Sequence, residues 1–162
     1  MPDIDVRITV LEPMRIASAL GFGENPEDEA WDKLFCWARE QGLLSRLDEH
    51  RFFGFNHPGP SAGSPNYGYE QWMTVGPGAK ENNDVEIKEF PGGVYAVTRC
   101  RFENLPATWQ RFVAWREDSK YQYVDDHCLE EVLTPWMMVA MSAGEPVNID
   151  DVLFDLYLPV IE

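Results

Sequence analysis

The stretch Trp31-Asp-Lys-Leu-Phe-Cys-Trp37 decides the fold of this chain, because a similar stretch, Trp109-Gln-Arg-Phe-Val-Ala-Trp115, follows 78 residues later. Each copy places large apolar side chains three and four residues apart, the spacing that gathers them on one face of an α-helix. The sequence therefore predicts two equivalent helices, one in each half of the chain.

The segments that flank these helices repeat as well. Asp84-Val-Glu-Ile-Lys-Glu-Phe-Pro aligns with Asp5-Val-Arg-Ile-Thr-Val-Leu-Glu, and both alternate apolar and polar residues as half-buried strands do. The final strand, Phe154 to Val160, stands where the Tyr69 to Val75 strand stands in the first half. We expect a single domain, 1–162, built from two strand–helix–strand–strand units at about 4–76 and 84–161.

One such unit leaves apolar surface uncovered, so the two units should join in one antiparallel sheet with two main helices, an α+β fold. A ligand cleft is expected at the pseudo-twofold where the units meet. Pro91-Gly-Gly93 predicts a tight turn inside a hairpin, and His57 to Asn66 predicts a loop. The inserted segment Pro135 to Asp151 carries an apolar run that predicts either a lid over the cleft or a dimer contact.

The net charge of -15 argues against a nucleic-acid surface, which needs clustered Lys and Arg, and favours cationic partners. The three cysteines, at 36, 100 and 128, lie far apart and are odd in number, so a disulfide framework is not expected. The first residues form no apolar leader and no run reaches membrane-spanning length. These features indicate a cytoplasmic protein with no membrane contact.

Four carboxylates stand within otherwise apolar strands: Glu70, Glu130, Glu131 and Asp155. Each either faces water at the edge of the sheet or turns into the cleft. Adjacent strand residues point to opposite faces, so Glu130 and Glu131 must point different ways. No paired spacing of zinc ligands and no phosphate or dinucleotide loop is present, so neither a metal nor a cofactor is expected.

The order of these segments resembles a known family. Pro-Gly-Gly-Val-Tyr-Ala-Val at 91–97, the helix with Trp109 and Trp115, the strand at Leu129-Glu130 and the closing Phe154-Asp-Leu-Tyr-Leu-Pro-Val160 are similar to the GyrI-like small-molecule-binding domain. That domain forms the effector-binding part of AraC-type and MerR-type multidrug regulators and also occurs alone. The resemblance implies a duplicated antiparallel sheet with two helices and a cleft for lipophilic cations.

The resemblance also implies a set of binding residues. The buried, ligand-facing Glu of the MerR-type relatives maps onto Glu130, with Val132 next on the same face. The aromatic residues of the cavity map onto Trp31, Phe102 and Trp72. Tyr69 and Trp109 complete the expected ligand-binding set. The regulators of the family carry a helix-turn-helix, for which this sequence has no spare segment, so direct DNA binding is not expected.

Three functions follow from these features. The first is a stand-alone binding module for amphipathic cations that stack on Trp31, Trp72 and Trp109 while Glu130 supplies the opposite charge. The second is a hydrolase of strained electrophiles, with Glu130 as general acid or base and Tyr69 or Tyr95 as its helper. The third is an acidic interaction protein of the gyrase-inhibitor type with a basic partner; a homodimer is a further alternative.

Overall fold

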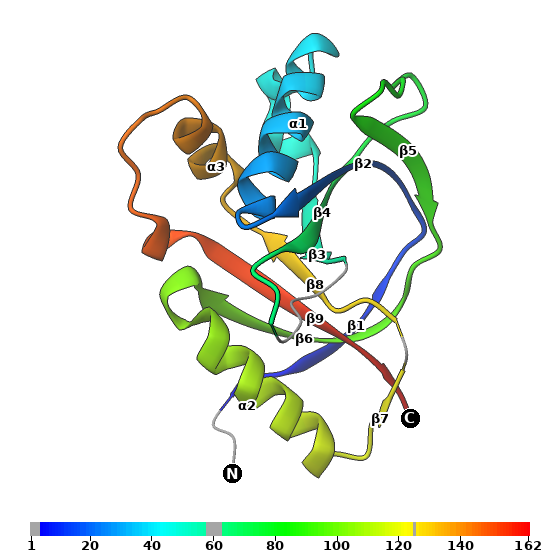
Figure 1. The fold of residues 1–162 in the computed structure, drawn as a ribbon. Coiled ribbons are helices and arrows are strands. Elements are labelled where there is room, and N and C mark those ends of the chain that lie inside the picture. Colours follow the sequence, from blue (N-terminus) through cyan, green and yellow to red (C-terminus); the bar gives the residue numbers. More distant parts are fainter. Residues whose placement is uncertain (1–3, 58–62, 125) are drawn as a thin grey trace.

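The computed structural model describes residues 4–57, 63–124 and 126–162, so part of the predicted loop from His57 to Asn66 lies outside the described residues. Over these described residues the fold is α+β, with one large antiparallel sheet and three α-helices, which confirms the predicted class (Figure 1). The helices are α1 (Pro26–Glu40), α2 (Leu105–Asp118) and α3 (Pro135–Ser142). The strands are β1 (Arg7–Leu11), β2 (Met14–Gly23), β3 (Phe52–Asn56), β4 (Tyr67–Thr74), β5 (Val85–Phe90), β6 (Gly93–Arg101), β7 (Gln122–Tyr123), β8 (Leu129–Val132) and β9 (Leu153–Ile161).

The strand order of the sheet is symmetric between the two halves of the chain. The order is β1-β6-β9-β8-β3-β4-β2-β5, with β7 attached to β9. If β1, β2, β3 and β4 are exchanged with β5, β6, β8 and β9, the same order returns in reverse. The centre of this symmetry lies between β3 and β8, where Phe52 pairs with Val132 and Gly54 with Glu130.

Each half donates its first strand to the other half. β1 pairs with β6, and β5 pairs with β2, so neither strand joins the sheet of its own unit. The prediction of a hairpin at Pro91-Gly-Gly93 was therefore wrong, because β5 and β6 meet at a corner and do not pair with each other. A Cβ at Gly92 would lie 2.2 Å from the carbonyl oxygen of Leu11, so the two corners touch and only glycine fits there.

All three helices pack against one face of the sheet and share one apolar core. α1 begins at Pro26, whose ring suits the first helical turn, and carries Glu27, Asp28 and Glu29 at its N-terminal end. Seven of its residues are buried, including Trp31, whereas α2 buries only Thr108 and Phe112. α1 is therefore the helix that holds the core of this face.

None of the helices in the described part of the chain packs on the other face of the sheet. Its apolar side chains pack against one another because the sheet curves, with the corners from β1 to β2 and from β5 to β6 on the same side (Figure 1). This second core is rich in aromatic rings, among them Phe53, Trp72, Tyr95 and Tyr157. Side chains on opposite faces of one strand therefore enter two different cores, and this difference decides which residues reach the site.

Candidate functional site

A cavity of about 840 Å³ lies on the helical face of the sheet, within the size range of small-molecule sites. It opens between the N-terminal half of α1, the helix α3 and the strands β4, β8 and β9, beside the junction of the two halves. Its lining residues are Asn25, Glu27, Asp28, Trp31, Asp32, Asn56, Tyr67, Tyr69, Phe102, Leu105, Glu130, Val132, Met138, Met141, Ser142, Ile149, Val152 and Phe154.

Among the described residues Glu130 is the lining carboxylate that the sheet contributes, and we call it the inner carboxylate. β8 alternates, so Glu130 and Val132 face the helices while Leu129 and Glu131 face the second core. The hydroxyl of Tyr69 donates to Oε1 of Glu130 at 3.0 Å, and Nε1 of Trp109 donates to Oε2 at 2.8 Å. Burial raises the pKa of Glu130 above its ordinary value, although these two hydrogen bonds act in the opposite direction.

The backbone beneath Glu130 is shaped for this arrangement. Gly54 pairs with Glu130 on one side and with Gln71 on the other. A Cβ at position 54 would lie 2.2 Å from the Tyr69 hydroxyl and 2.6 Å from Oε1 of Gln71. Gly54 therefore leaves the space that the Tyr69 hydroxyl occupies when it reaches Glu130.

Three further carboxylates line the outer part of the cavity, all from the first two turns of α1. Both oxygens of Glu27 accept from the Tyr67 hydroxyl, at 2.5 and 2.9 Å. Asp32 accepts from the Ser142 hydroxyl at 3.4 Å, which links α1 to the end of α3. Asp28 is exposed between them. The charge of Glu27 also raises the pKa of Glu130, so the inner and outer carboxylates interact electrostatically.

The rest of the wall is apolar. Trp31 projects from α1 and packs against Phe35 and Phe52, with ring centroids 5.0 and 5.8 Å apart. α3 adds Met138 and Met141, flexible side chains that adapt to ligands of different shape. An apolar wall with a few carboxylates suits an amphipathic ligand that carries positive charge.

Five of the seven residues expected to bind ligand line this cavity: Trp31, Tyr69, Phe102, Glu130 and Val132. Trp109 does not line it but supports it from behind through its hydrogen bond to Glu130. Trp72 is not brought to the cavity. Trp72 points to the opposite face of the sheet, where it packs on Phe55 and Phe90. Tyr95 lies in the same second core.

The other three acidic candidates neither turn into the cavity nor face water, so neither of the two expected placements holds for them. Glu70 contacts Lys88 and His57, each at 3.0 Å. Glu131 is held by Arg51 at 2.8 Å. Asp155 contacts Arg99 at 2.9 Å and Arg7 at 3.0 Å. All three are buried on the face without helices, and each has a cationic partner.

Sequence reasoning missed the outer carboxylates and Tyr67. Glu27 and Asp28 have an ordinary structural role in the first turn of a helix, so their type and position gave no reason to single them out. Tyr67 lies two residues before Tyr69 and therefore on the same face of β4, a signal that the alternation of that strand contained.

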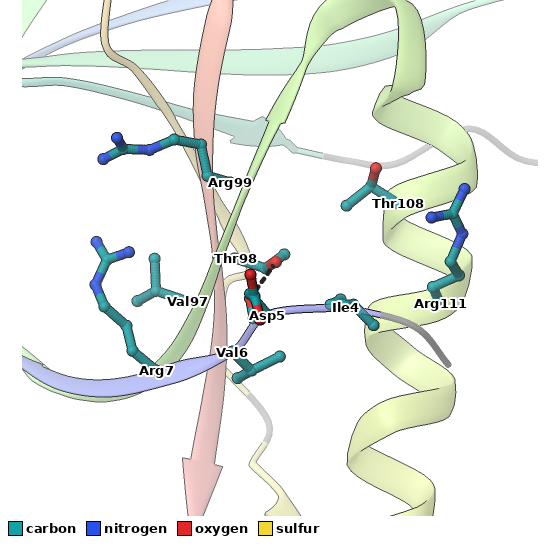
Figure 2. A pocket seen from close by; sticks show the side chains of 9 residues that line it. All are labelled: Ile4, Asp5, Val6, Arg7, Val97, Thr98, Arg99, Thr108 and Arg111. Carbon is teal, nitrogen blue, oxygen red and sulfur yellow. Dashed lines mark hydrogen bonds between the residues drawn. The ribbon is translucent and has the colours of Figure 1, made fainter. Parts of the chain in front are cut away.

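A second cavity, of about 520 Å³, lies between the N-terminal strand, β6 and α2 (Figure 2). It is lined by Arg7, Arg99 and Arg111, but Figure 2 shows Arg7 and Arg99 on one side of β6 and Arg111 with Thr108 on the other. Arg7 and Arg99 are also already paired with Asp155. The guanidinium groups therefore do not converge on one anion.

Two classes of feature are absent from the part of the chain that the structure describes. No group of three or more His, Cys, Asp or Glu side chains is placed to hold a metal ion. No helix is long and apolar enough to cross a membrane.

The fold and its cavity define a class of protein, the GyrI-like effector-binding domain. The family described as "Cass2: Integron-associated effector binding protein" matches residues 7–160, and the chain belongs to this family. The resemblance predicted from the sequence is therefore confirmed. No curated protein sequence matches the chain.

Solved structures with the same fold share little sequence with this chain. The C-terminal domain of EcmrR matches with a TM-score of 0.71 and 11% identity, covering 99% of both chains. In a complex of EcmrR with DNA, the match covers 98% of this chain but only 57% of EcmrR, with 12% identity and a TM-score of 0.70. A hydrolase from Listeria innocua has a TM-score of 0.60 and 11% identity, with 99% and 93% coverage. SAV2435 bound to tetraphenylphosphonium has a TM-score of 0.51 and 9% identity, with 98% and 94% coverage.

Proposed function

We propose that this protein binds amphipathic cations in the cavity between α1, α3 and the sheet, with Glu130 as the counter-charge. The observation that carries the proposal is that the carboxylate of Glu130 is desolvated without a cationic partner in the described part of the chain. It is held by two neutral donors, Tyr69 and Trp109, and has no ion-pair partner among the described residues, while burial raises its pKa. A cation placed beside it would relieve the cost of that buried charge.

The aromatic walls support a lipophilic cation over a small hydrated one. Trp31 and Phe102 line the same cavity as Glu130, and a cation–π contact contributes about 0.5–2 kcal/mol. The neighbour SAV2435 holds tetraphenylphosphonium, a cation of this kind, in a structure of the same fold.

The charge of the chain supports a ligand-binding role without direct contact to DNA. A net charge of -15 opposes approach to phosphate, although the related EcmrR fold occurs within a DNA complex. The three cysteines are free, which suits a reducing cytoplasm.

The test is a titration of rhodamine 6G, a fluorescent lipophilic cation, into the wild type and Glu130→Gln. Gln keeps the shape and acceptor oxygen of Glu130 but removes the charge, so we expect affinity to fall by about thirtyfold or more, the effect of losing one partner of a buried charge pair. Glu117→Gln, an exposed change on α2, removes the same charge away from the cavity and serves as the control. Equal affinity for wild type and Glu130→Gln contradicts the proposal.

A second candidate is hydrolysis, and the hydrogen bond from Tyr69 to Glu130 favours it. A carboxyl with a raised pKa beside a phenol is suited to proton transfer, and two structural neighbours are named hydrolases. Incubation with styrene oxide, a strained electrophile, should then yield the diol with wild type, with loss of turnover in both Glu130→Gln and Tyr69→Phe. A diol yield no higher than in buffer alone leaves binding as the function.

A further inference from the structure

The charged side chains that line the cavity are all of one sign. Glu27, Asp28, Asp32 and Glu130 are carboxylates, and no Lys, Arg or His is among the lining residues. Such a group raises the free energy of the empty cavity by repulsion between like charges. A single cation at Glu130 would leave the three outer carboxylates without a partner.

The fully buried carboxylates of this chain lie outside the cavity, and each is paired with a cation. Glu70, Glu131 and Asp155 each contact Lys or Arg. Within residues 4–57, 63–124 and 126–162, none of the four cavity carboxylates forms an ion pair with a side chain of the protein. Water solvates the exposed Asp28 and Asp32, whereas a cationic partner for the less exposed Glu27 and Glu130 is expected from outside the chain.

Helix stabilisation accounts for only part of this arrangement. Acidic residues in a first helical turn interact favourably with the helix dipole, which applies to Glu27, Asp28 and Glu29. Glu29 lies in the same turn but does not line the cavity, and it forms an ion pair with Lys33 at 3.6 Å. The dipole explains neither the two contacts of the Tyr67 hydroxyl with Glu27 nor the presence of Asp32 one turn further on.

Tyr67 and Tyr69 fix two separate positions for positive charge. Both phenols leave the same face of β4, two residues apart, so their Cα atoms are about 7 Å apart along the strand. Tyr69 holds Glu130 at the inner position, and Tyr67 holds Glu27 at the outer one. Apolar wall residues, including Trp31 and Leu105, complete the same cavity.

We propose that the ligand is a dication with an apolar aromatic body, one positive group beside Glu130 and the other beside Glu27. This inference rests on the proposed function, since it assigns the ligand class of the same cavity. Asp28 and Asp32 add to the negative potential around the outer group. A monocation leaves the outer position unpaired, so the dication of the same shape binds more tightly.

The test compares two ligands that differ in one charge. Methyl viologen carries a quaternary nitrogen at each end of a two-ring body, and 1-methyl-4-(4-methylphenyl)pyridinium has the same shape with one of these nitrogens replaced by carbon. Neither charge titrates, so pH does not alter the ligands. Isothermal titration calorimetry at fixed ionic strength should show that wild type prefers methyl viologen by about fivefold, the effect of one partly exposed ion pair at the upper end of its range.

Three variants assign the preference to a position. Glu27→Gln keeps an acceptor for Tyr67 and should reduce the preference for methyl viologen to about twofold or less. Glu40→Gln removes an exposed carboxylate at the far end of the same helix and should leave the preference as in wild type. If Glu27→Gln does not fold, as judged by its thermal unfolding, Asp32→Asn removes an exposed outer charge and should reduce the preference in the same direction.

The outcomes separate this inference from the proposed function. If both ligands bind equally to wild type, or if Glu27→Gln weakens both by the same factor, the dication inference is wrong, while a Glu130-dependent affinity for the monocation still supports the proposed function. If Glu130→Gln leaves the affinity for both ligands unchanged, the proposed function itself is wrong.

Discussion

At the scale of single residues, Glu130 differs from its neighbour Glu131 in the side chains that surround it. Glu131 accepts hydrogen bonds from Nε and Nη2 of Arg51, at 2.8 and 2.9 Å, and from the hydroxyl of Tyr157. Glu130 accepts from the neutral Tyr69 and Trp109, and no charged donor contacts it within the described residues. Two adjacent carboxylates thus have opposite roles, one closing a structural ion pair and the other facing a cavity.

The raised pKa of Glu130 predicts a pH-dependent affinity. A bound cation stabilises the ionised carboxylate, so binding releases a proton at pH values below the pKa of the free protein. Affinity for methyl viologen should rise by up to about tenfold per pH unit below that pKa and become constant above it. Calorimetry across pH, with Glu130→Gln as the reference, measures this difference. A constant ratio between wild type and Glu130→Gln at every pH contradicts the prediction.

The face of Glu130 could be predicted from the sequence, because period-2 alternation forces Glu130 and Glu131 apart and the resemblance selects Glu130. The same alternation places Tyr69 and Trp72 on opposite faces of one strand. Assigning both to one site therefore conflicted with the strand period, and Trp72 lies in the second core. Pairing across the sheet, such as that of Glu131 with Arg51, depends on strand order and could not be read from one segment.

At the scale of elements, α3 is the part of the site that the repeat could not predict. It has no counterpart in the first half, and its apolar residues surround the helix without a clear stripe, so sequence alone left a lid and a dimer contact open. In the structure Met138 and Met141 line the cavity, while Trp136 is 60% exposed. The cavity side and the outer side of α3 can therefore be tested separately.

We expect Met138→Ala to weaken binding of rhodamine 6G by about fivefold to thirtyfold, since it removes apolar surface that the ligand would cover. Trp136→Ala should leave this affinity close to the wild-type value. The measurements are fluorescence titration and the mass in solution by light scattering. If Trp136→Ala instead changes the mass while Met138→Ala leaves affinity unaltered, α3 is a contact between chains and not a wall of the site.

At the scale of the whole molecule, buried carboxylates fasten the exchanged strands. Glu70 on β4 binds Lys88 of β5, a strand from the other half. Asp155 on β9 binds Arg7 of β1, again across the halves. β4 and β9 occupy equivalent places in the strand order, as do β5 and β1. An ion pair between a buried carboxylate and the exchanged strand therefore joins the two halves at both equivalent positions.

Glu70 should make the fold sensitive to acid. Burial alone would raise its pKa, but hydrogen bonds from Trp72, His57, Ser18 and Lys88 outweigh burial and lower the pKa to about 2. Because the folded-state pKa is lower than the ordinary value of 4.5, this stabilisation is complete above 4.5 and is lost as pH falls towards 2. It amounts to about 3 kcal/mol of unfolding free energy.

Urea unfolding of wild type and Glu70→Gln from pH 7 to pH 3 measures the loss. The stability difference between the two proteins should be largest near neutrality and should shrink continuously as the solution is acidified. Glu117→Gln, an exposed change on α2, is the control. A difference that stays constant with pH would show that shape, and not charge, accounts for the effect of the substitution.

Because the two halves belong to one chain, the two sides of the cavity can carry different residues. In a homodimer of one half, rotational symmetry would force every wall residue to occur twice around the axis. A covalent link between the halves removes that constraint, so Glu27 of α1 has as its counterpart Leu105 of α2, and both line one cavity. A ligand therefore meets a charged side and an apolar side, and it can be bound in one orientation where a symmetric dimer would offer two.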